Sequence, residues 1–368
     1  MNNFPQNLTV LLEPTADCNL RCRHCYHAKT DYVKKRMSIP TLNKFLKCVA
    51  GYYRDVKIIW HGGEPILMGY DFFENAYALF KRFSAEYNIR FKFGIQTNGI
   101  LLNDNLIDLF VKTNTHISIS FDGVFNDVLR QGTKEVECVI SKLKNRRVEF
   151  SCISTISSAN VRHMKEMYEF FNGLAISVKF NPIYSDGAAT ENNDFLISKE
   201  DWAHNFLELF EYWYNDADCN IRFISCMEVL RKYLISYYGC LGGICLYRYL
   251  AVDSYGDLYP CGRLISDDFR LANVDALTDI REAFISPKYS ELSRVASIRA
   301  EKCKSCTWFS RCHSGCNASA NLGGDLATAY PFDCYFTQYV FGKLEKILSN
   351  NKTINPYAKE LMARLQGK

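Results

Sequence analysis

The stretch Cys18-Asn-Leu-Arg-Cys22-Arg-His-Cys25 places three cysteines at a C-x3-C-x2-C spacing. It follows the apolar run Leu8–Leu12, which predicts a first β-strand that ends just before the cysteines. Three thiolates from so short a segment need a loop that turns back on itself, as loops around iron–sulfur clusters do. A cubane takes four ligands, so three cysteines would leave one iron open to a small molecule. A structural zinc loop is the alternative, but zinc ligands more often come as C-x2–4-C pairs.

Length and composition are those of an ordinary globular protein. The 368 residues are 48% hydrophobic and 23% charged, and the net charge of +4 is too small to favour nucleic-acid binding. No apolar run approaches about 18 residues, and the start shows no signal peptide. We therefore predict a cytoplasmic protein that neither spans a membrane nor binds nucleic acid. In that setting sixteen cysteines indicate metal or redox chemistry rather than disulfides.

Residues 1–185 alternate short apolar runs with amphipathic segments, the pattern of a parallel α/β sheet. The expected strands are Leu8–Leu12, Val56–Trp60, Phe91–Gln96, His116–Phe121, Val148–Thr155 and Ala175–Phe180. The expected helices lie near 39–50, 70–87, 103–113, 133–145 and 160–172, with Asn103 as N-cap of the third. Six such units are too few for an eight-stranded barrel, and active residues should lie at the C-terminal strand ends.

Those strand ends carry further motifs. Trp60-His-Gly-Gly-Glu-Pro65 follows the second strand, Gln96-Thr-Asn-Gly99 the third and Ser120-Phe-Asp-Gly123 the fourth. Together with the cysteine loop, these motifs resemble the radical S-adenosylmethionine (radical SAM) superfamily. The resemblance implies a partial (β/α)6 barrel of the TIM type. It also implies a [4Fe–4S] cluster held by Cys18, Cys22 and Cys25, with SAM bound at the open iron.

By the same resemblance, other strand-end residues would contact SAM. Gly62, Gly63 and Glu64 would bind its amino group, because glycines allow close approach and a carboxylate accepts hydrogen bonds. Arg130 suits the SAM carboxylate through a bidentate pair, and an unrelated surface arginine is the alternative interpretation. The remaining expected contacts are His24, Tyr26, Asn98, Ser120 and Asp122. His24 departs from the family pattern, which usually has another aromatic residue before the third cysteine.

A second cysteine array lies in the final third of the chain. Its spacing is C-x10-G-x4-C, then C-x2-C-x5-C-x3-C, then a last cysteine. The cysteines are Cys245, Cys261, Cys303, Cys306, Cys312, Cys316 and Cys334. This pattern resembles the SPASM extension of radical SAM enzymes, which implies two auxiliary [4Fe–4S] clusters and so three clusters in all. Two cubanes need eight thiolates, and Cys240 is the preferred eighth ligand, with Cys226 as the alternative.

The resemblance also implies how the auxiliary ligands divide. The first cluster would take Cys240, Cys245, Cys261 and Cys316, and the second Cys303, Cys306, Cys312 and Cys334. Each cluster would join distant segments, so this region should need iron in order to fold. Residues Tyr249–Tyr259, with a turn at Asp253-Ser-Tyr-Gly256, predict a β-hairpin that positions Cys261. Cys48, Cys138, Cys152 and Cys219 fit neither array and receive no role.

The motifs divide the chain into a radical SAM barrel at 1–220, a SPASM domain at 221–350 and a tail at 351–368. Residues 185–200 are expected to form a loop, either a lid over the substrate or a linker. The helix expected near 199–215 is rich in Trp and Tyr, which favours packing in the core.

The two cysteine arrays together imply an oxidoreductase. In the family, a reduced cluster and SAM supply a 5′-deoxyadenosyl radical that takes a hydrogen atom from the substrate, while the protein orients and shields the reaction. Auxiliary clusters would remove a second electron. The expected partners are a peptide substrate and a reductant such as flavodoxin or ferredoxin. An iron–sulfur electron carrier or a zinc scaffold is the alternative without enzyme activity, but neither needs the Gly-Gly-Glu-Pro or Ser-x-Asp-Gly motifs.

Two features bear on the substrate. Sulfatase-maturing enzymes, which form formylglycine, carry an aspartate as base directly after the cysteine of a Y-P-C hairpin, whereas Gly262 and Arg263 follow Cys261 here. Those enzymes also tend to have Gln at the place of His61. We therefore favour a maturase that forms carbon–carbon, thioether or ether crosslinks in a ribosomally made precursor peptide. Formylglycine formation and oxidation of a small molecule are the alternatives. Asp122, Asp257 and Glu228 are candidate bases, and none is assigned.

Recognition of a leader peptide is the last expectation. Only 17 residues precede Cys18, so the leader-binding domain of many peptide maturases is not expected there. Leader recognition would need a separate protein or a surface of this chain, such as an exposed strand edge.

Overall fold

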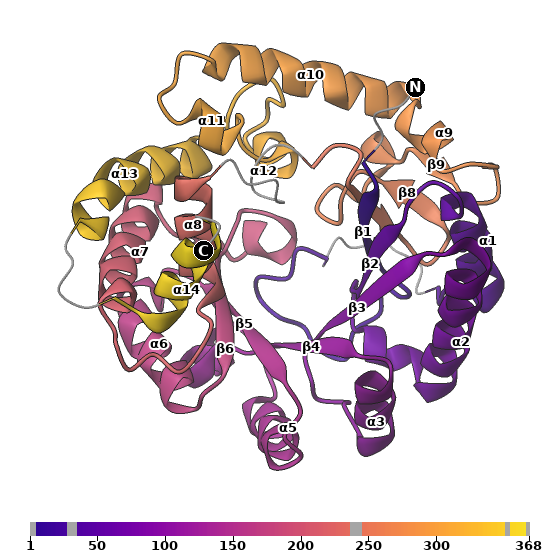
Figure 1. The fold of residues 1–368 in the computed structure, drawn as a ribbon, viewed down its shortest axis with the longest axis horizontal. Helices are drawn as coiled ribbons and strands as arrows, with labels where there is room; N and C mark the ends of the chain where they lie inside the picture. Colours follow the sequence, from indigo (N-terminus) through magenta and orange to yellow (C-terminus); the bar gives the residue numbers. More distant parts are fainter. Residues whose placement is uncertain (1–4, 28–34, 236–244, 350–353, 366–368) are drawn as a thin grey trace.

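Six parallel strands form a curved sheet in the computed structural model, which describes residues 5–27, 35–235, 245–349 and 354–365. They are β1 (Asn7–Leu12), β2 (Asp55–Trp60), β3 (Arg90–Thr97), β4 (Thr115–Ser120), β5 (Phe150–Ile156) and β6 (Ser177–Pro182). Their order in the sheet follows the chain, and each pairs in parallel with the next. The predicted partial (β/α)6 barrel is therefore confirmed (Figure 1).

Helices cover the outer, convex face of this sheet (Figure 1). They are α1 (Ile39–Val49), α2 (Tyr70–Tyr87), α3 (Asp104–Lys112), α5 (Thr133–Asn145) and α6 (Met164–Gly173). The one-turn helix α4 (Asn126–Leu129) instead contacts the cysteine segment, because the Leu129 carbonyl accepts a hydrogen bond from the Arg23 N–H. The predicted cap of α3 is confirmed, since the Asn103 side chain accepts a hydrogen bond from the Leu106 N–H at 3.0 Å. Each of the longer helices α1, α2, α3, α5 and α6 buries its apolar face against the strands, as its amphipathic pattern predicts.

The aromatic core holds α2 against the sheet. Trp60, the last residue of β2, is fully buried and donates a hydrogen bond from Nε1 to the Tyr77 hydroxyl at 3.2 Å. That hydroxyl also lies 2.8 Å from the Thr115 hydroxyl at the start of β4. The Phe73 ring meets Trp60 edge-on at 5.3 Å between centroids. The strand ends that carry the motifs are thus fixed by packing beneath them.

The C-terminal region extends the same sheet. The predicted hairpin is confirmed as β7 (Tyr249–Val252) and β8 (Asp257–Tyr259), and β9 (Ala272–Asn273) follows antiparallel to β8. The sequence did not predict that β7 pairs in parallel with β1, in a register that places Leu12 opposite Val252. This pairing lays the turn after β7 beside the segment that leads to the first cysteines.

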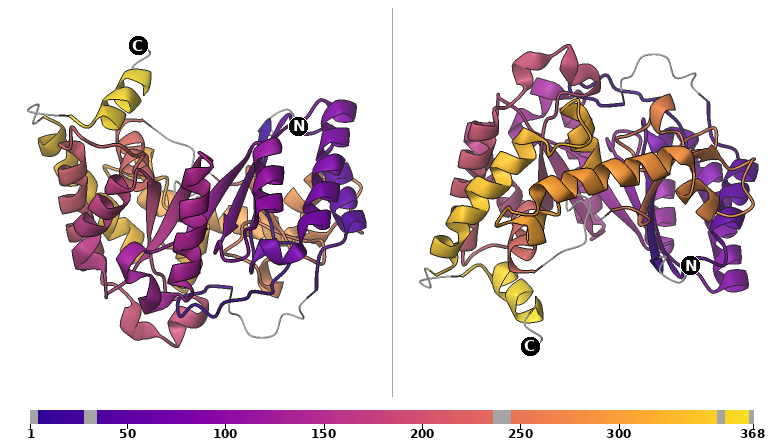
Figure 2. Two further views of the ribbon diagram at one scale, coloured as in Figure 1. Left: turned by 90° about the horizontal axis from the view of Figure 1, so that it is seen from below. Right: turned by 90° about the horizontal axis from the view of Figure 1, so that it is seen from above.

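The remaining helices lie on the β6 side of the barrel, beside strand β9, and between these two across the open side of the curve (Figures 1 and 2). They are α7 (Lys199–Tyr214), α8 (Ile224–Leu234), α9 (Arg281–Phe284), α10 (Pro287–Cys303), α11 (Phe309–Cys312), α12 (Asn317–Leu322), α13 (Pro331–Leu348) and α14 (Pro356–Leu365). Helix α13 packs along α7, and α11 contacts α8 on the β6 side. Trp202 and Trp213 of α7 are buried as predicted, whereas Tyr212 is 36% exposed. None of the described helices is both long and apolar enough to cross a membrane.

A substitution at Gly256, in the β7–β8 turn, would test how closely the hairpin packs against the barrel. Its φ is +84°, and an added Cβ would lie 2.6 Å from Val274 Cγ2 and 3.0 Å from Thr41 Cγ2, beside the start of α1. Gly51 has the same φ of +84° with nothing within 4 Å of such a Cβ, which makes Gly51→Ala a matched control. We expect Gly256→Ala to lower the urea midpoint further, by the equivalent of about 1–3 kcal/mol of overpacking. Equal midpoints for the two variants would contradict close packing at this turn.

Candidate active site

The cysteine loop leaves the C-terminal end of β1 and brings its three thiols together. Burial raises the pKa of the Cys18 thiol, and Glu64 and Cys22 raise it further. Burial also raises the pKa of Cys22, where the Arg130 guanidinium acts in the opposite direction and Cys25 adds to the rise. The Cys25 N–H closes a turn on the Cys22 carbonyl at 3.2 Å. Three thiols that interact within one turn fit the three-thiolate ligand set expected of a cluster loop.

The Gly-Gly-Glu turn after β2 lies directly against this loop. The Gly63 N–H donates to the Thr15 carbonyl at 3.0 Å, and the Glu64 N–H donates to the Asp17 carbonyl at 2.7 Å. A Cβ on Gly63 would lie 2.1 Å from the Asp17 oxygen, so only glycine allows this approach. The loop and the turn therefore behave as one hydrogen-bonded unit.

Glu64 is almost fully buried beneath this turn. Its carboxylate accepts hydrogen bonds from the Thr97 hydroxyl at 2.7 Å and from the Asn98 N–H at 2.8 Å. Burial raises the pKa of Glu64 to about 7, although these hydrogen bonds act to lower it. The Asn98 side chain reaches back toward the Cys18 sulfur at 3.9 Å. Two of the predicted SAM contacts thus lie beside the first cysteine.

Arg130 lies on the other side of the cysteine loop. Its Nε donates to Asp122 Oδ2 at 2.8 Å and its Nη2 to the Thr155 hydroxyl at 2.9 Å. The Arg130 side chain is only 11% exposed, so the interpretation as a surface arginine is wrong. The Thr155 hydroxyl also lies 3.2 Å from His24 Nε2. At the C-terminal ends of β3 and β4, Gln96 Nε2 donates a hydrogen bond to Ser120 Oγ at 2.8 Å. Glu64, Asn98, Asp122 and Arg130 thus lie beside the cysteine loop, whereas the contact seen for Ser120 is with Gln96. Their binding of SAM stays a prediction.

The segment 185–200 packs against the cysteine loop. It contains two short 3₁₀ helices, Gly187–Thr190 and Asn193–Phe195. The Ala188 N–H donates to the Cys25 carbonyl at 3.0 Å, and Asn192 Nδ2 donates to the Arg23 carbonyl at 3.2 Å. The segment is therefore packed against the loop, rather than serving only as a linker.

The second cysteine array separates into two groups in space. Burial raises the pKa of Cys334, and three neighbouring thiols, those of Cys312, Cys306 and Cys303, add to the rise. Cys245, Cys261 and Cys316 instead line a common small pocket. These are the groupings that the resemblance implies, with Cys240 lying outside the described residues. The alternative ligand Cys226 is fully buried in α8 within the main hydrophobic core.

Arg299 lies between the two groups and was not predicted. It is 1% exposed, and Cys316, Cys303, Cys245 and Cys312 all act on its pKa, which burial lowers. Its Nε donates to the Ser314 carbonyl at 3.0 Å, and a second nitrogen donates to Asn317 Oδ1. A lone arginine in helix α10 carries no motif that would have marked it.

The three candidate bases are each held by a partner. Asp122 is paired with Arg130, and Glu228 with Lys179 at 2.8 Å. Asp257 accepts a hydrogen bond from Asn273 Nδ2 at 2.8 Å. None of them lines the pocket that lies between the cysteine loop and the β7–β8 hairpin.

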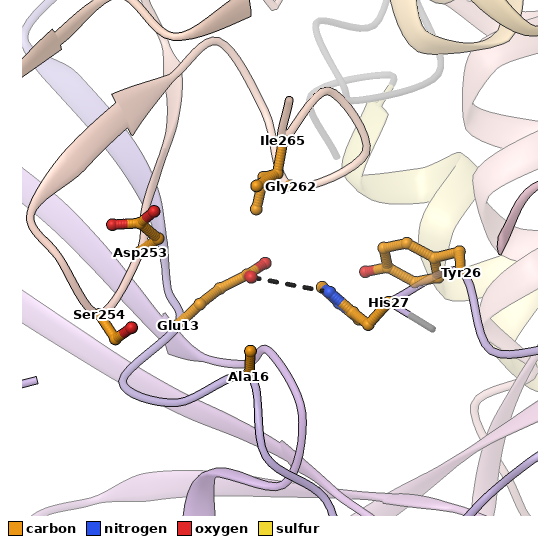
Figure 3. Close-up of a pocket in the computed structure, with 8 residues that line it drawn as sticks. All are labelled: Glu13, Ala16, Tyr26, His27, Asp253, Ser254, Gly262 and Ile265. Carbon is orange, nitrogen blue, oxygen red and sulfur yellow. Dashed lines mark ion pairs between the residues drawn. The ribbon is translucent and has the colours of Figure 1, made fainter. Parts of the chain in front are cut away.

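That pocket contains residues that sequence reasoning missed. Its lining residues are Glu13, Ala16, Tyr26, His27, Asp253, Ser254, Gly262 and Ile265 (Figure 3). Ligand atoms of Glu13, His27 and His61 lie within 4.8 Å of one another at its edge. The sequence did contain one indication of this pocket. Glu13 is a carboxylate directly after the first strand, at the end of the sheet where active residues are expected.

Comparisons with known proteins agree with this architecture. A model of the radical SAM superfamily matches residues 12–178, and a model of the SPASM iron–sulfur cluster-binding domain matches residues 240–307. The cysteine-type anaerobic sulfatase-maturating enzyme of Clostridium perfringens is 25% identical, over 94% of this chain and 99% of that protein. The serine-type enzyme of Klebsiella aerogenes is 25% identical over 87% of this chain and 82% of that protein.

Solved structures give the same picture. Native anSMEcpe with bound AdoMet superposes with a TM-score of 0.80 and 25% identity, over 94% of this chain and all of that one. Streptococcus suis SuiB bound to precursor peptide SuiA shares the fold, with a TM-score of 0.64 and 16% identity over 89% of this chain and 76% of that one. The two domain matches imply SAM and [4Fe–4S] clusters, and the gathered thiols are suitable ligands for such clusters.

Replacing Cys312 tests the second auxiliary group. We expect Cys312→Ala to lower the iron content of the anaerobically reconstituted protein by about four atoms per chain, one cubane. The reason is that Cys312 is one of the three thiols that gather around Cys334. Iron analysis together with the visible absorption spectrum measures the loss.

Cys226→Ala is the matched control, because this cysteine is fully buried in the main core and the thiol that acts on its pKa is that of Cys219, which belongs to neither group. It should keep the full iron content, whereas Cys240→Ala should lose iron. Iron loss in Cys226→Ala comparable to that in Cys312→Ala would make Cys226 the eighth ligand.

Proposed function

We propose that this chain, which carries a radical SAM domain followed by a SPASM domain, oxidises a cysteine or serine side chain of a peptide or protein to formylglycine. One observation carries the proposal: the similarity to the cysteine-type sulfatase-maturating enzyme extends over 94% of the chain and so includes both domains. The serine-type enzyme matches at the same identity, so both side chains are candidate substrates.

The chain's own residues would supply the setting for this oxidation. Cys18, Cys22 and Cys25 would hold one cluster, and the strand-end residues around them would orient SAM. Bound SAM and the clusters would together remove one hydrogen atom and one electron from the substrate side chain. The protein then has to orient that side chain, exclude water and accept one proton.

The size of the pocket supports a side chain rather than a free small molecule as the reacting group. Its volume is about 40 Å³, whereas sites for whole small molecules usually enclose about 300–1,000 Å³. The pocket lies between Tyr26, which follows Cys25, and Gly262, which follows Cys261. A side chain that enters there would be close to both cysteine arrays, while the peptide backbone stays outside.

Peptide crosslinking is the second candidate. Two residues favour it: Gly262 replaces the aspartate of the sulfatase-maturing pattern, and His61 replaces its glutamine. The likeness to SuiB concerns the fold alone. The relatives with the higher identity are sulfatase-maturating enzymes, so formylglycine formation is preferred here over the crosslinking that the motifs alone favour.

The test uses the Cp18Cys peptide, which is bound in a solved structure of anSMEcpe, and a serine analogue. The reconstituted protein, SAM and a chemical reductant should convert the cysteine or serine into an aldehyde, read by mass spectrometry after capture with a hydrazide. Cys22→Ala should form neither aldehyde nor 5′-deoxyadenosine, because the cluster that activates SAM is lost.

Two results would redirect the assignment. Loss of two hydrogen atoms without a hydrazide-reactive aldehyde, in this peptide or in the peptide encoded beside the gene, would support crosslinking instead. Release of 5′-deoxyadenosine with every peptide unchanged would overturn both candidates and leave radical chemistry on another substrate.

A further inference from the structure

The pocket of Figure 3 is built from three separate parts of the chain. Glu13 follows β1, Tyr26 and His27 follow the third cysteine of the loop, and Asp253 and Gly262 flank strand β8. The parallel pairing of β1 with β7 brings these parts together, since Leu12 is opposite Val252. The pocket is therefore a product of the tertiary fold and not of one motif.

Glu13 has an unusual environment for a carboxylate. It is 6% exposed, and its Oε1 accepts no hydrogen bond from any residue that the structure describes. Among the described residues it provides the only buried carboxylate oxygen in that state. An unsatisfied buried oxygen costs free energy and usually has a functional reason. In Figure 3 the carboxylate points into the space between the lining residues.

Both carboxylate oxygens of Asp253, the other acidic residue of the pocket, already accept hydrogen bonds within the protein. Asp253 Oδ1 accepts hydrogen bonds from the Tyr255 and Asp257 N–H groups, both at 2.9 Å, and Oδ2 accepts one from the Tyr259 hydroxyl at 3.3 Å. Asp253 therefore shapes the β7–β8 turn. Glu13 is left as the acidic group with an oxygen available to a ligand.

Two histidines lie beside the Glu13 carboxylate. His27 Nδ1 lies 3.7 Å from Glu13 Oε2, and His61 Nδ1 lies 3.9 Å from Glu13 Oε1. The two rings are also joined, with 3.3 Å between His27 Nε2 and His61 Nδ1. His61 is the residue that stands where the sulfatase-maturing pattern has glutamine. The change from glutamine to His61 therefore occurs together with a carboxylate, Glu13, beside that position.

The position of Gly262 relates Glu13 to the aspartate of the sulfatase-maturing pattern. A Cβ built on this glycine would lie 3.3 Å from Glu13 Oε1. The sulfatase-maturing pattern has an aspartate at this position, directly after the cluster cysteine. Glu13 thus brings a carboxylate, from the opposite wall of the pocket, to the place where the side chain of residue 262 would begin.

We propose that Glu13 is the catalytic base of this chain and takes the proton from the thiol or hydroxyl of the substrate side chain, with His27 and His61 as positioning residues. The inference rests on the proposed function and deepens it. The S–H or O–H bond breaks and its proton goes to Glu13. The neighbouring carbon would lose one hydrogen atom and one electron through the chemistry that SAM, bound by the residues around Cys18, Cys22 and Cys25, and the auxiliary clusters would supply. A C=S or C=O bond forms, and water then replaces sulfur as hydrogen sulfide leaves.

Burial, with a contribution from Asp253, raises the pKa of Glu13 well above its usual range. A higher pKa makes the ionised carboxylate a stronger proton acceptor, but it also lowers the fraction of Glu13 that is ionised at a given pH, and only the ionised form can act as the base.

The experiment compares three variants of the reconstituted enzyme on the Cp18Cys peptide. Glu13→Gln should form product about a hundredfold more slowly, the usual size of a general-base contribution. It should still release 5′-deoxyadenosine, so the yield of product per 5′-deoxyadenosine should fall. Glu86→Gln, on the exposed face of α2, is the control and should match the wild type. Glu13→Ala with Gly262→Asp should regain most of the rate that Glu13→Ala alone loses, because it restores a carboxylate from the other wall.

A second readout does not depend on turnover. Without reductant, the wild type should bind the cysteine peptide several-fold more tightly than its alanine analogue, and Glu13→Ala should bind both equally. Iron content and the absorption spectrum check that each variant retains its clusters.

The outcomes separate the two proposals. If the wild type leaves the peptides unmodified, formylglycine formation fails and the role of Glu13 fails with it. If the wild type forms the aldehyde and Glu13→Gln does so at the same rate, only the role of Glu13 is overturned. Zinc or iron beyond the cluster content that disappears in Glu13→Gln would make Glu13 a metal ligand, and would also overturn its role as a base.

Discussion

The parallel pairing of β1 with β7 is the contact on which the site depends. It joins the first strand of the barrel to the first strand of the C-terminal hairpin, with Leu12 opposite Val252. Because the strands are parallel and in register, the segments that leave their C-terminal ends emerge at the same edge of the sheet. One of these segments leads to Cys18 and the other is the β7–β8 turn, whereas Cys261 follows β8, which runs back antiparallel to β7. The pocket of Figure 3 is lined by residues of both segments and by Gly262.

Each group of cysteines lies beside a buried or half-buried arginine. Arg130 acts on Cys22, Arg263 on Cys261 and Cys316, and Arg299 on cysteines of both auxiliary groups. A cluster held by thiolates is an anionic centre, and charges and hydrogen bonds near its sulfurs set its reduction potential. Clusters bound by these cysteines would therefore have relative potentials that depend on the positions of the arginines.

The sequence predicted what local patterns encode. Strands, helices, the Asn103 cap and the β7–β8 hairpin all depend on neighbouring residues, and the structure contains each of them. The pairing of β1 with β7 joins residues about 240 positions apart, such as Thr9 and Tyr249, and no local pattern reports it. Glu13 and Arg299 were missed for a related reason. A single charged residue is normally a surface residue, and only the tertiary fold shows that these two are buried.

The same pairing has a consequence for synthesis on the ribosome. Until β7 has been made, the outer edge of β1 has no strand beside it and could pair with another chain. At roughly 5–20 residues per second, translation takes on the order of tens of seconds to cover the interval between the two strands. During that time the nascent barrel exposes a β-edge next to its first three cysteines. Timely protection of that edge by chaperones, or slow delivery of iron, would then influence how much correctly assembled protein a cell obtains.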